Sequence, residues 1–273
     1  MLFYFIRFVQ KVINAHFKIL RFIWHWFYKL NILIEAFWLS VLSEKKLYYL
    51  LQKFYQKNAR YRSDETTTQG PFSWEQKIID KYPIANSNIV IVGAGGGREA
   101  YMLSKIGCQI NAFEADLAMA NYAKSFFKEK NLPVNFTQLP INTIPSAKCD
   151  VFWLGWGVYT HFIGKTKRVE ILKEINHNLK ENGLIIISFW AEKRNADTIQ
   201  TVDRIAKKIN KRTVELGESF KNGMWAKYYT RTQITEEARL AGLSVDLISN
   251  EEYGHAVLKP DNSNQPINLV KNP

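Results

Sequence analysis

The stretch Val92–Glu99, which reads VGAGGGRE, decides the fold of this 273-residue chain. It continues the run NIVIVG (88–93), which is typical of a buried strand, and it leads into a helical pattern that ends near residue 106. Glycines at such a turn let the backbone bend sharply and approach a ligand where a Cβ would collide. The first N–H groups of the new helix point into the same crevice. The segment therefore predicts a ligand-binding turn in an α/β sheet.

Strand-like runs alternate with helical patterns on the C-terminal side of this turn, which indicates a parallel sheet. We expect further strands at 109–114, 134–138, 149–155 and 184–190, followed by two closing strands at 243–249 and 253–258. We expect helices at 117–130, 165–181 and 231–241, and an extra amphipathic helix marked by Ile199, Val202, Ile205 and Ile209. Seven strands in this order predict one open, doubly wound, mostly parallel sheet.

The glycine spacing separates the cofactor classes that use this architecture. A nicotinamide-binding GxGxxG would need its third glycine at position 98, which is Arg98, and no Gly-Lys-Ser/Thr follows to make a phosphate loop. The chain reads GxGxG instead, with Gly93, Gly95 and Gly97. The expected second strand ends in Glu114, whose carboxylate can accept both hydroxyl protons of a ribose. The pattern indicates an adenosine-containing cofactor, and GxGxG favours adenosylmethionine.

The chain resembles the class I S-adenosylmethionine-dependent methyltransferases from about Pro71 to Pro260. The resemblance is carried by VGAGGGRE, FEAD (113–116), CDVFWLGWGVYTHF (149–162), LKENGLIIISFW (179–190) and YGHAVL (253–258). It implies that the three glycines flank the methionine part of S-adenosyl-L-methionine and that Glu114 holds its ribose. The family often has an acidic residue after strand three that contacts the adenine amine. This chain has QLPINTIP there, so Asn142 or a backbone group is the expected substitute.

The loop after the expected fourth strand lies where ligands bind in such sheets. Gly155 and Trp156 are therefore expected to border the cofactor, and Asp116 to cap a helix. Tyr159 is a candidate wall of the substrate pocket. His161 is a candidate general base, because the pKa of histidine lies near working pH, although it can equally be a packed histidine. The Asn/Asp-Pro-Pro-Tyr tetrad of nucleobase amino-methylation is absent from this loop.

The distribution of charge and of Gly and Pro residues divides the chain into four parts. Residues 1–62 have eleven Lys/Arg against Glu35 and Glu44 and contain neither Gly nor Pro, so they predict a basic helical extension. The expected parts that follow are a linker (63–71), the methyltransferase domain (72–260) and a loose tail (261–273). Cys108 and Cys149 lie in apolar surroundings and suggest core residues in a reducing, cytoplasmic compartment. No paired CxxC or HxxxH element is present, so no metal is expected.

The N-terminal extension has one polar stripe and is otherwise almost entirely apolar. The stripe recurs at steps of three and four: Arg7, Lys11, Asn14, Lys18, Arg21, His25 and Lys29. This pattern favours a helix that lies on a membrane surface, since several cations in any span-length window would be costly near the bilayer centre. The alternatives are a helical lid packed on the α/β domain and a homodimer face.

The sequence thus predicts a methyltransferase that acts on a small-molecule or lipid-like acceptor, and that is cytoplasmic or peripheral on a membrane. The alternatives are a nucleic-acid or protein methyltransferase, a non-enzymatic adenosyl-ligand binder and a nicotinamide oxidoreductase. A nucleic-acid partner is disfavoured because the basic excess avoids the α/β zone and no nucleic-acid-binding module is recognised.

Overall fold

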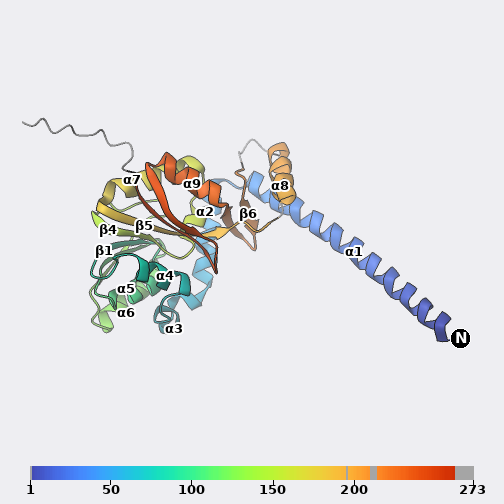
Figure 1. The fold of residues 1–273 in the computed structure, drawn as a ribbon, viewed down its shortest axis with the longest axis horizontal. Coiled ribbons are helices and arrows are strands. Elements are labelled where there is room, and N and C mark those ends of the chain that lie inside the picture. The colour runs from blue at the N-terminus through green and yellow to red at the C-terminus, as the bar shows by residue number, and fades with distance from the viewer. Residues whose placement is uncertain (1, 195, 210–213, 262–273) are drawn as a thin grey trace, which may run out of the picture. The chain divides into compact units, whose positions relative to one another are not determined.

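The computed structural model describes residues 2–194, 196–209 and 214–261 (Figure 1). They fall into two compact units, one of residues 1–43 and 194–221, the other of 44–193 and 222–273. The sequence analysis places the domain boundary at residues 63–71 instead. In the structure, residues 44–62 are therefore part of the unit that holds the sheet. Residues 262–273 of the expected tail lie outside the described part of the chain.

The larger unit is built on the expected sheet. Parallel pairings join the strands in the order β3-β2-β1-β4-β5, and the last strand, β9, pairs antiparallel with both β5 and β8. This arrangement confirms the two expected closing strands and shows that both of their pairings are antiparallel. The bounds are β1 Asn88–Val92, β2 Gln109–Glu114, β3 Val134–Gln138, β4 Cys149–Leu154, β5 Leu179–Ala191, β8 Leu243–Ser249 and β9 Gly254–Pro260.

Helices cover both faces of this sheet because its strands bury side chains on both. In β1, Ile89 and Ile91 belong to one hydrophobic core, and Val90 and Val92 to the other. Helices α4 to α6 lie on the first face and α7 and α9 on the second (Figure 1). Their bounds are α4 Ser73–Lys81, α5 Arg98–Ser104, α6 Leu117–Glu129, α7 Lys165–Asn178 and α9 Arg231–Leu240. The doubly wound α/β prediction is confirmed, with element ends that differ by a few residues.

The sequence analysis missed two strands. They are β6 (Glu218–Lys221), in the smaller unit, and β7 (Met224–Tyr229), which pairs with the end of β5 through Trp190 and Ala191. Each strand is short, and Asn222 and Gly223 between them both have positive φ. Strand β5 is also longer than the expected 184–190, since it begins at Leu179.

The segment before the sheet forms helices that pack on it. These are α2 (Glu44–Lys57), the 3-10 helix η1 (Ala59–Arg62) and the short α3 (Asp64–Thr67), which Ser63 caps through Thr66 N–H. Helix α2 buries Leu47 and Leu51 and packs on β7. Of residues 1–62, α2 therefore packs on the α/β unit, as the alternative of a helical lid expected.

The smaller unit contains α1 (Leu2–Val41), α8 (Ala196–Ile209) and β6. Helix α1 packs on α8 and β6 through its C-terminal end, where Ser40 donates a hydrogen bond to the carbonyl of Ala206. Glu35 is buried there, accepts a hydrogen bond from Ser219 and pairs with Arg194. The expected amphipathic helix at residues 199–209 is confirmed as α8.

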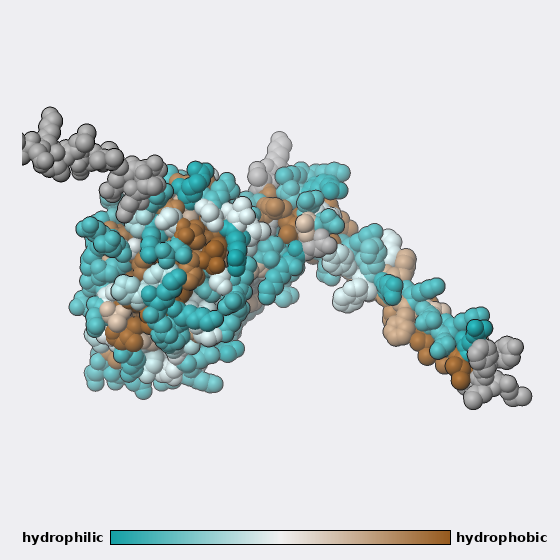
Figure 2. Space-filling view, viewed as in Figure 1, coloured by the Kyte–Doolittle hydropathy of each residue, from teal (hydrophilic) through white to brown (hydrophobic). Residues whose placement is uncertain are grey.

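The face of α1 that packs is continuous with its basic stripe. The buried positions Ile32, Glu35, Ala36, Leu39 and Ser40 lie at helical spacing in line with the stripe that starts at Arg7. The opposite side is apolar and exposed from Ile6 to Val41, and teal and brown sides of α1 are visible in Figure 2. Within the described residues, no helix is both long and apolar enough to cross a membrane.

Candidate functional site

A cavity of about 330 Å³ opens at the carboxyl ends of β1, β2 and β4. The order of the sheet reverses between β1 and β4, which is where ligands bind in open α/β sheets. The glycine turn and Glu114 line one side of the cavity, and Leu51 and Tyr55 of α2 line another. A segment that the sequence analysis assigned to an extension is therefore a wall of the site.

The glycines of the turn have separate reasons for being glycine, although Gly93, Gly95 and Gly97 all have positive φ. A Cβ on Gly93 would lie 2.2 Å from Val158 Cγ2, and one on Gly97 would lie 2.6 Å from Phe127 Cε2. A Cβ on Gly95 would meet nothing within 4 Å. Gly93 and Gly95 line the cavity, whereas Gly97 does not and packs against the core instead.

Gly96 shows how the preceding segment closes on the turn. A Cβ on Gly96 would lie 2.0 Å from the carbonyl oxygen of Tyr61 in η1. The Thr67 hydroxyl donates a hydrogen bond of 3.2 Å to the Gly96 carbonyl. Thus η1 and α3 hold the glycine turn from outside the sheet, a contact for which the sequence offered no signal.

Glu114 lies at the end of β2 and faces the cavity. One of its oxygens accepts a hydrogen bond from Gly95 N at 2.8 Å and the other accepts one from Asp116 N at 2.8 Å. Burial raises the pKa of Glu114, and the two N–H donors oppose that rise. Asp116 accepts from Met119 N at 2.9 Å, which confirms it as the N-cap of α6.

Asn142, the expected partner of the adenine amine, lines the cavity in a left-handed conformation with φ of 64°. Its Oδ1 is buried and has no hydrogen-bond partner among the described residues. A buried acceptor without a partner is costly, so this oxygen suits a ligand that brings an N–H donor.

Arg98 begins α5 at the edge of the cavity but does not point to a free ligand site. Its guanidinium makes a bidentate pair with Glu75 of α4, with N···O distances of 2.7 and 2.6 Å, and a further contact of 3.1 Å with Glu99. Glu99 in turn accepts a hydrogen bond of 2.9 Å from Trp156 N. This buried group joins α4, the glycine turn and the loop after β4, and the sequence analysis did not identify Glu75 as part of it.

The loop after β4 contains four predicted site residues, Gly155, Trp156, Tyr159 and His161, and its helical geometry decides which of them line the cavity. It forms the 3-10 helix η2 (Val158–His161), in which residues three apart lie on the same side. Val158 and His161 therefore both line the cavity. Trp156 lines it as well, with its ring 5.0 Å from that of Phe72. Gly155 does not, because its Cα faces the carbonyl of Gly93, where a Cβ would lie at 2.3 Å.

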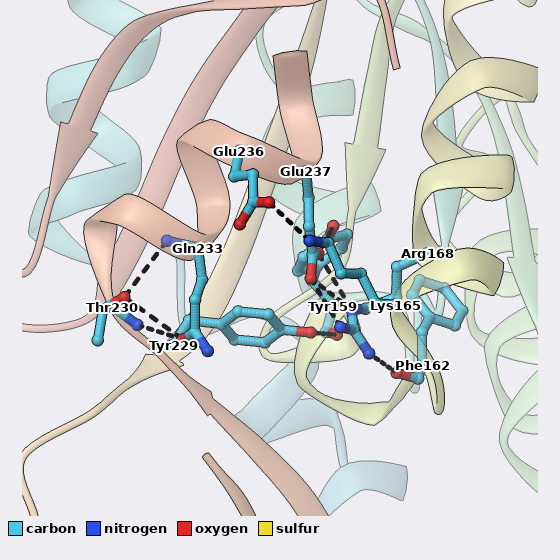
Figure 3. A network of polar contacts seen from close by, with 9 residues as sticks. All are labelled: Tyr159, Phe162, Lys165, Arg168, Tyr229, Thr230, Gln233, Glu236 and Glu237. Carbon is cyan, nitrogen blue, oxygen red and sulfur yellow. Dashed lines mark hydrogen bonds and ion pairs between the residues drawn. The ribbon is translucent and has the colours of Figure 1, made fainter. Parts of the chain in front are cut away.

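The expectation that Tyr159 forms a wall of the substrate pocket is wrong, because Tyr159 does not line the cavity. Its side chain points toward Glu237 instead (Figure 3). It is fully buried, and its hydroxyl donates to Glu237 of α9 at 2.6 Å. Arg168 of α7, also fully buried, holds the same carboxylate, with a closest contact of 2.6 Å. The network ties the loop after β4 to α7 and α9, so Tyr159 positions the site from behind.

His161 faces the cavity, but both of its ring nitrogens have partners. Its Nδ1 lies 3.3 Å from the carbonyl oxygen of Trp225 in β7, and its Nε2 lies 2.8 Å from the hydroxyl of Tyr55. Burial lowers the pKa of His161 to about 4. His161 is therefore neutral at working pH, and Tyr55 is the part of the pair contributed by α2.

Comparisons with known proteins agree with this fold. Residues 90–187 match the family described as "Methyltransferase domain". No curated protein matches the chain. Similar solved structures include S-adenosylmethionine-dependent methyltransferases from Methanosarcina mazei and Clostridium acetobutylicum, each 14% identical, and a protein from Pyrococcus horikoshii that is 16% identical. The M. mazei structure has a TM-score of 0.56, and the match covers 67% of this chain and 96% of that one. The C. acetobutylicum structure has a TM-score of 0.53, with 78% and 98% covered. The P. horikoshii structure has a TM-score of 0.57, with 76% and 98% covered.

At these identities the solved structures establish the fold, while the family match covers the glycine turn and strands β2 to β4. The chain therefore contains a methyltransferase domain of the S-adenosylmethionine-dependent class.

Proposed function

We propose that this enzyme methylates a small-molecule or lipid-like acceptor inside the cavity between the glycine turn and α2. The observation that carries the proposal is the composition of that cavity. Its sheet side consists of the glycine turn, Glu114 and Asn142, and its other side consists of Leu51 and Tyr55 of α2. An acceptor that reaches the cofactor must fit beneath a helix, which favours a small or extended molecule over a folded macromolecule.

The residues of the sheet side fit the cofactor. Glu114 has carboxylate oxygens directed to the cavity for ribose hydroxyls, and Asn142 Oδ1 is a buried acceptor suited to the adenine amine. Gly95 leaves open space where any side chain would intrude. When bound, the cofactor supplies a methyl group on a cationic sulfur.

The protein's contribution is positioning and the exclusion of water. The turn is held by η1 and α3, and the loop after β4 is held by Glu99, Glu237 and the pair of His161 with Tyr55. Fixing two reactants in line removes much of the entropic barrier to a displacement reaction. The helical wall of α2 keeps this reaction out of bulk water.

We also propose that α1 binds the surface of an anionic membrane. Its apolar side is exposed from Ile6 to Val41 and includes large aromatic side chains such as Trp24, 74% exposed, and Trp26, 61% exposed. The basic stripe lies on the opposite side, in line with the face that packs on α8 and β6. An interfacial helix has this arrangement, with its apolar side in the acyl boundary and its cations near head groups. A cytoplasmic enzyme that is peripheral on a membrane would follow.

Replacement of Glu114 by Ala tests the cofactor site. The loss of a charge-assisted contact to ribose is expected to cost about 1.5–3 kcal/mol, or roughly ten- to a hundredfold in affinity. Titration calorimetry with adenosylmethionine measures the change, and circular dichroism confirms that the variant is folded. Unchanged affinity in a folded variant would remove Glu114 from the cofactor site.

The acceptor class is tested with labelled methyl donor. Incubation of the full-length enzyme with separate lipid, small-molecule, RNA and protein fractions is expected to label the lipid or small-molecule fraction. Labelling confined to RNA or protein would overturn the proposed acceptor class while leaving the methyltransferase activity intact.

A further inference from the structure

The contact between Tyr55 and His161 has a direction that the geometry determines. A backbone carbonyl only accepts hydrogen bonds, so Nδ1 of His161, 3.3 Å from the Trp225 oxygen, carries the ring hydrogen. A neutral imidazole has a single N–H, and Nε2 is therefore an acceptor. It follows that the Tyr55 hydroxyl, 2.8 Å away, donates its hydrogen to Nε2. Toward the cavity the Tyr55 oxygen then offers only lone pairs.

This pair accepts hydrogen bonds but is a poor acceptor of protons. Full burial of His161 lowers its pKa to about 4, and burial raises the pKa of Tyr55. A proton passed through Tyr55 to Nε2 would leave a buried imidazolium whose hydrogen-bond partners, Tyr55 and the Trp225 carbonyl, carry no negative charge. The pair is thus suited to hold a hydrogen-bond donor in place and not to remove its proton.

The carboxylates of the cavity are already engaged. Glu114 accepts from two backbone N–H groups, and Asp116 caps α6. Glu99 accepts from Arg98 and from Trp156 N. Arg60, also on the cavity lining, adds a cation. None of these groups is arranged as a free general base beside Tyr55.

We propose that the methyl acceptor is a neutral amine nitrogen whose N–H donates a hydrogen bond to the oxygen of Tyr55. The inference rests on the proposed function and names its substrate class. A hydroxyl must lose its proton as it attacks, since the oxonium it would otherwise form is strongly acidic. An amine attacks with its lone pair and keeps its hydrogen, so no base is needed in the displacement.

The step balances without a further reactant. The nitrogen lone pair forms the new N–C bond while the methyl–sulfur bond of the donor breaks, and that electron pair stays on sulfur. The product nitrogen is a cation whose N–H remains bonded to Tyr55 until release, when the proton passes to water. The aromatic rings of Tyr55, Tyr61 and Trp156 line the cavity and can stabilise this cation through their faces.

The position of the transferred methyl group tests the proposal directly. The full-length enzyme is incubated with donor labelled with ¹³C at the methyl carbon, together with tyramine, which carries an amine and a phenol, and with a deproteinised cell extract. The ¹³C chemical shift distinguishes N-methyl from O-methyl products. Label on nitrogen supports the proposal, and label on oxygen, sulfur or carbon overturns it while leaving the methyltransferase function standing.

Variants of the pair test the role of Tyr55. Tyr55→Phe is expected to raise KM for the labelled acceptor at least tenfold with little change in cofactor affinity, whereas Tyr49→Phe, an exposed tyrosine of the same helix, is expected to change neither. His161→Gln retains an acceptor for the Tyr55 hydroxyl and is expected to preserve activity better than His161→Leu. Equal KM values for Tyr55→Phe and the wild type would overturn the contact.

The protonation of His161 supplies a readout that needs no turnover. Nitrogen NMR is expected to show an unprotonated Nε2 and a protonated Nδ1 at pH 7, with Nε2 shifting in Tyr55→Phe. The acid limb of the rate profile is expected to follow the pKa of the acceptor amine in both the wild type and His161→Gln. A limb that disappears in His161→Gln would identify His161 as a base and overturn the proposal.

Discussion

Single residues of the glycine turn have different roles, and alanine separates them. Gly95→Ala adds a methyl group in open space on the cavity wall, at a left-handed position that costs about 1–2 kcal/mol. Gly97→Ala pays the same conformational cost and also drives a Cβ into Phe127, for which overpacking adds about 1–3 kcal/mol. We expect Gly95→Ala to lose cofactor affinity and Gly97→Ala chiefly stability. Calorimetry and urea unfolding check this, and a reversed pattern would exchange the two roles.

His161 makes stability depend on pH. Burial lowers its pKa from 6.5 to about 4, so between these values the unfolded chain binds a proton that the folded chain does not. Stability therefore falls as pH falls through this window, by at most about 1.4 kcal/mol per unit. His161→Gln lacks this component, whereas His255, whose pKa is also lowered, is present in both proteins.

Urea unfolding of both proteins from pH 7 to 4.5 measures the effect. The stability advantage of the wild type over His161→Gln is expected to shrink as the pH decreases. A constant difference would mean that His161 titrates normally in the folded protein.

At the scale of elements, η2 connects the sheet to the surrounding helices through hydrogen bonds. Tyr159 anchors it to α9 through Glu237, and Thr160 accepts a hydrogen bond from Trp190 N of β5 at 2.8 Å. Tyr159→Phe removes a hydrogen bond to a charged group, which is expected to cost about 1.5–3 kcal/mol of stability. Cofactor affinity is expected to stay within about twofold of the wild type. Lost affinity with unchanged stability would return Tyr159 to the binding site.

At the scale of the whole molecule, vesicle flotation tests the proposed binding of α1 to a membrane surface. We expect the full-length protein to float with anionic vesicles, less so at high salt, since each basic residue near the surface contributes about 1 kcal/mol. Ile23→Glu with Phe27→Glu, on the apolar side, should abolish flotation at any salt. Lys18→Glu with Arg21→Glu, on the stripe, should remove only the salt-sensitive part. A protein that sediments as a dimer without detergent and does not float with vesicles would contradict the membrane proposal. The apolar side of α1 would then be assigned to contact with a second copy of the chain.

The sequence by itself determined the sheet, the glycine turn and the cofactor side of the site. These features are local: strands buried on both faces read as apolar runs, and the distance from Gly97 to Glu114 is one helix and one strand. The place of Asp116 before a helical pattern predicted its role as a cap, and the resemblance to the methyltransferase family implied the closing strand. Glu114 and Asn142 both line the cavity, and their roles toward the cofactor remain predictions that binding measurements test.

Only the tertiary structure decided the side of the cavity that α2 and η2 form. The pairs Tyr55–His161 and Glu75–Arg98 join segments 106 and 23 residues apart, and their residues have no shared spacing that a sequence pattern could detect. Tyr159 and His161 are two residues apart, yet a 3-10 helix turns one toward the core and the other toward the cavity. Helical periodicity could identify the apolar side of residues 1–62. It could not show that α2 packs on β7, whereas the apolar side of α1 itself is exposed. An amphipathic pattern identifies an apolar face, and only the tertiary structure shows whether that face is packed and against which element.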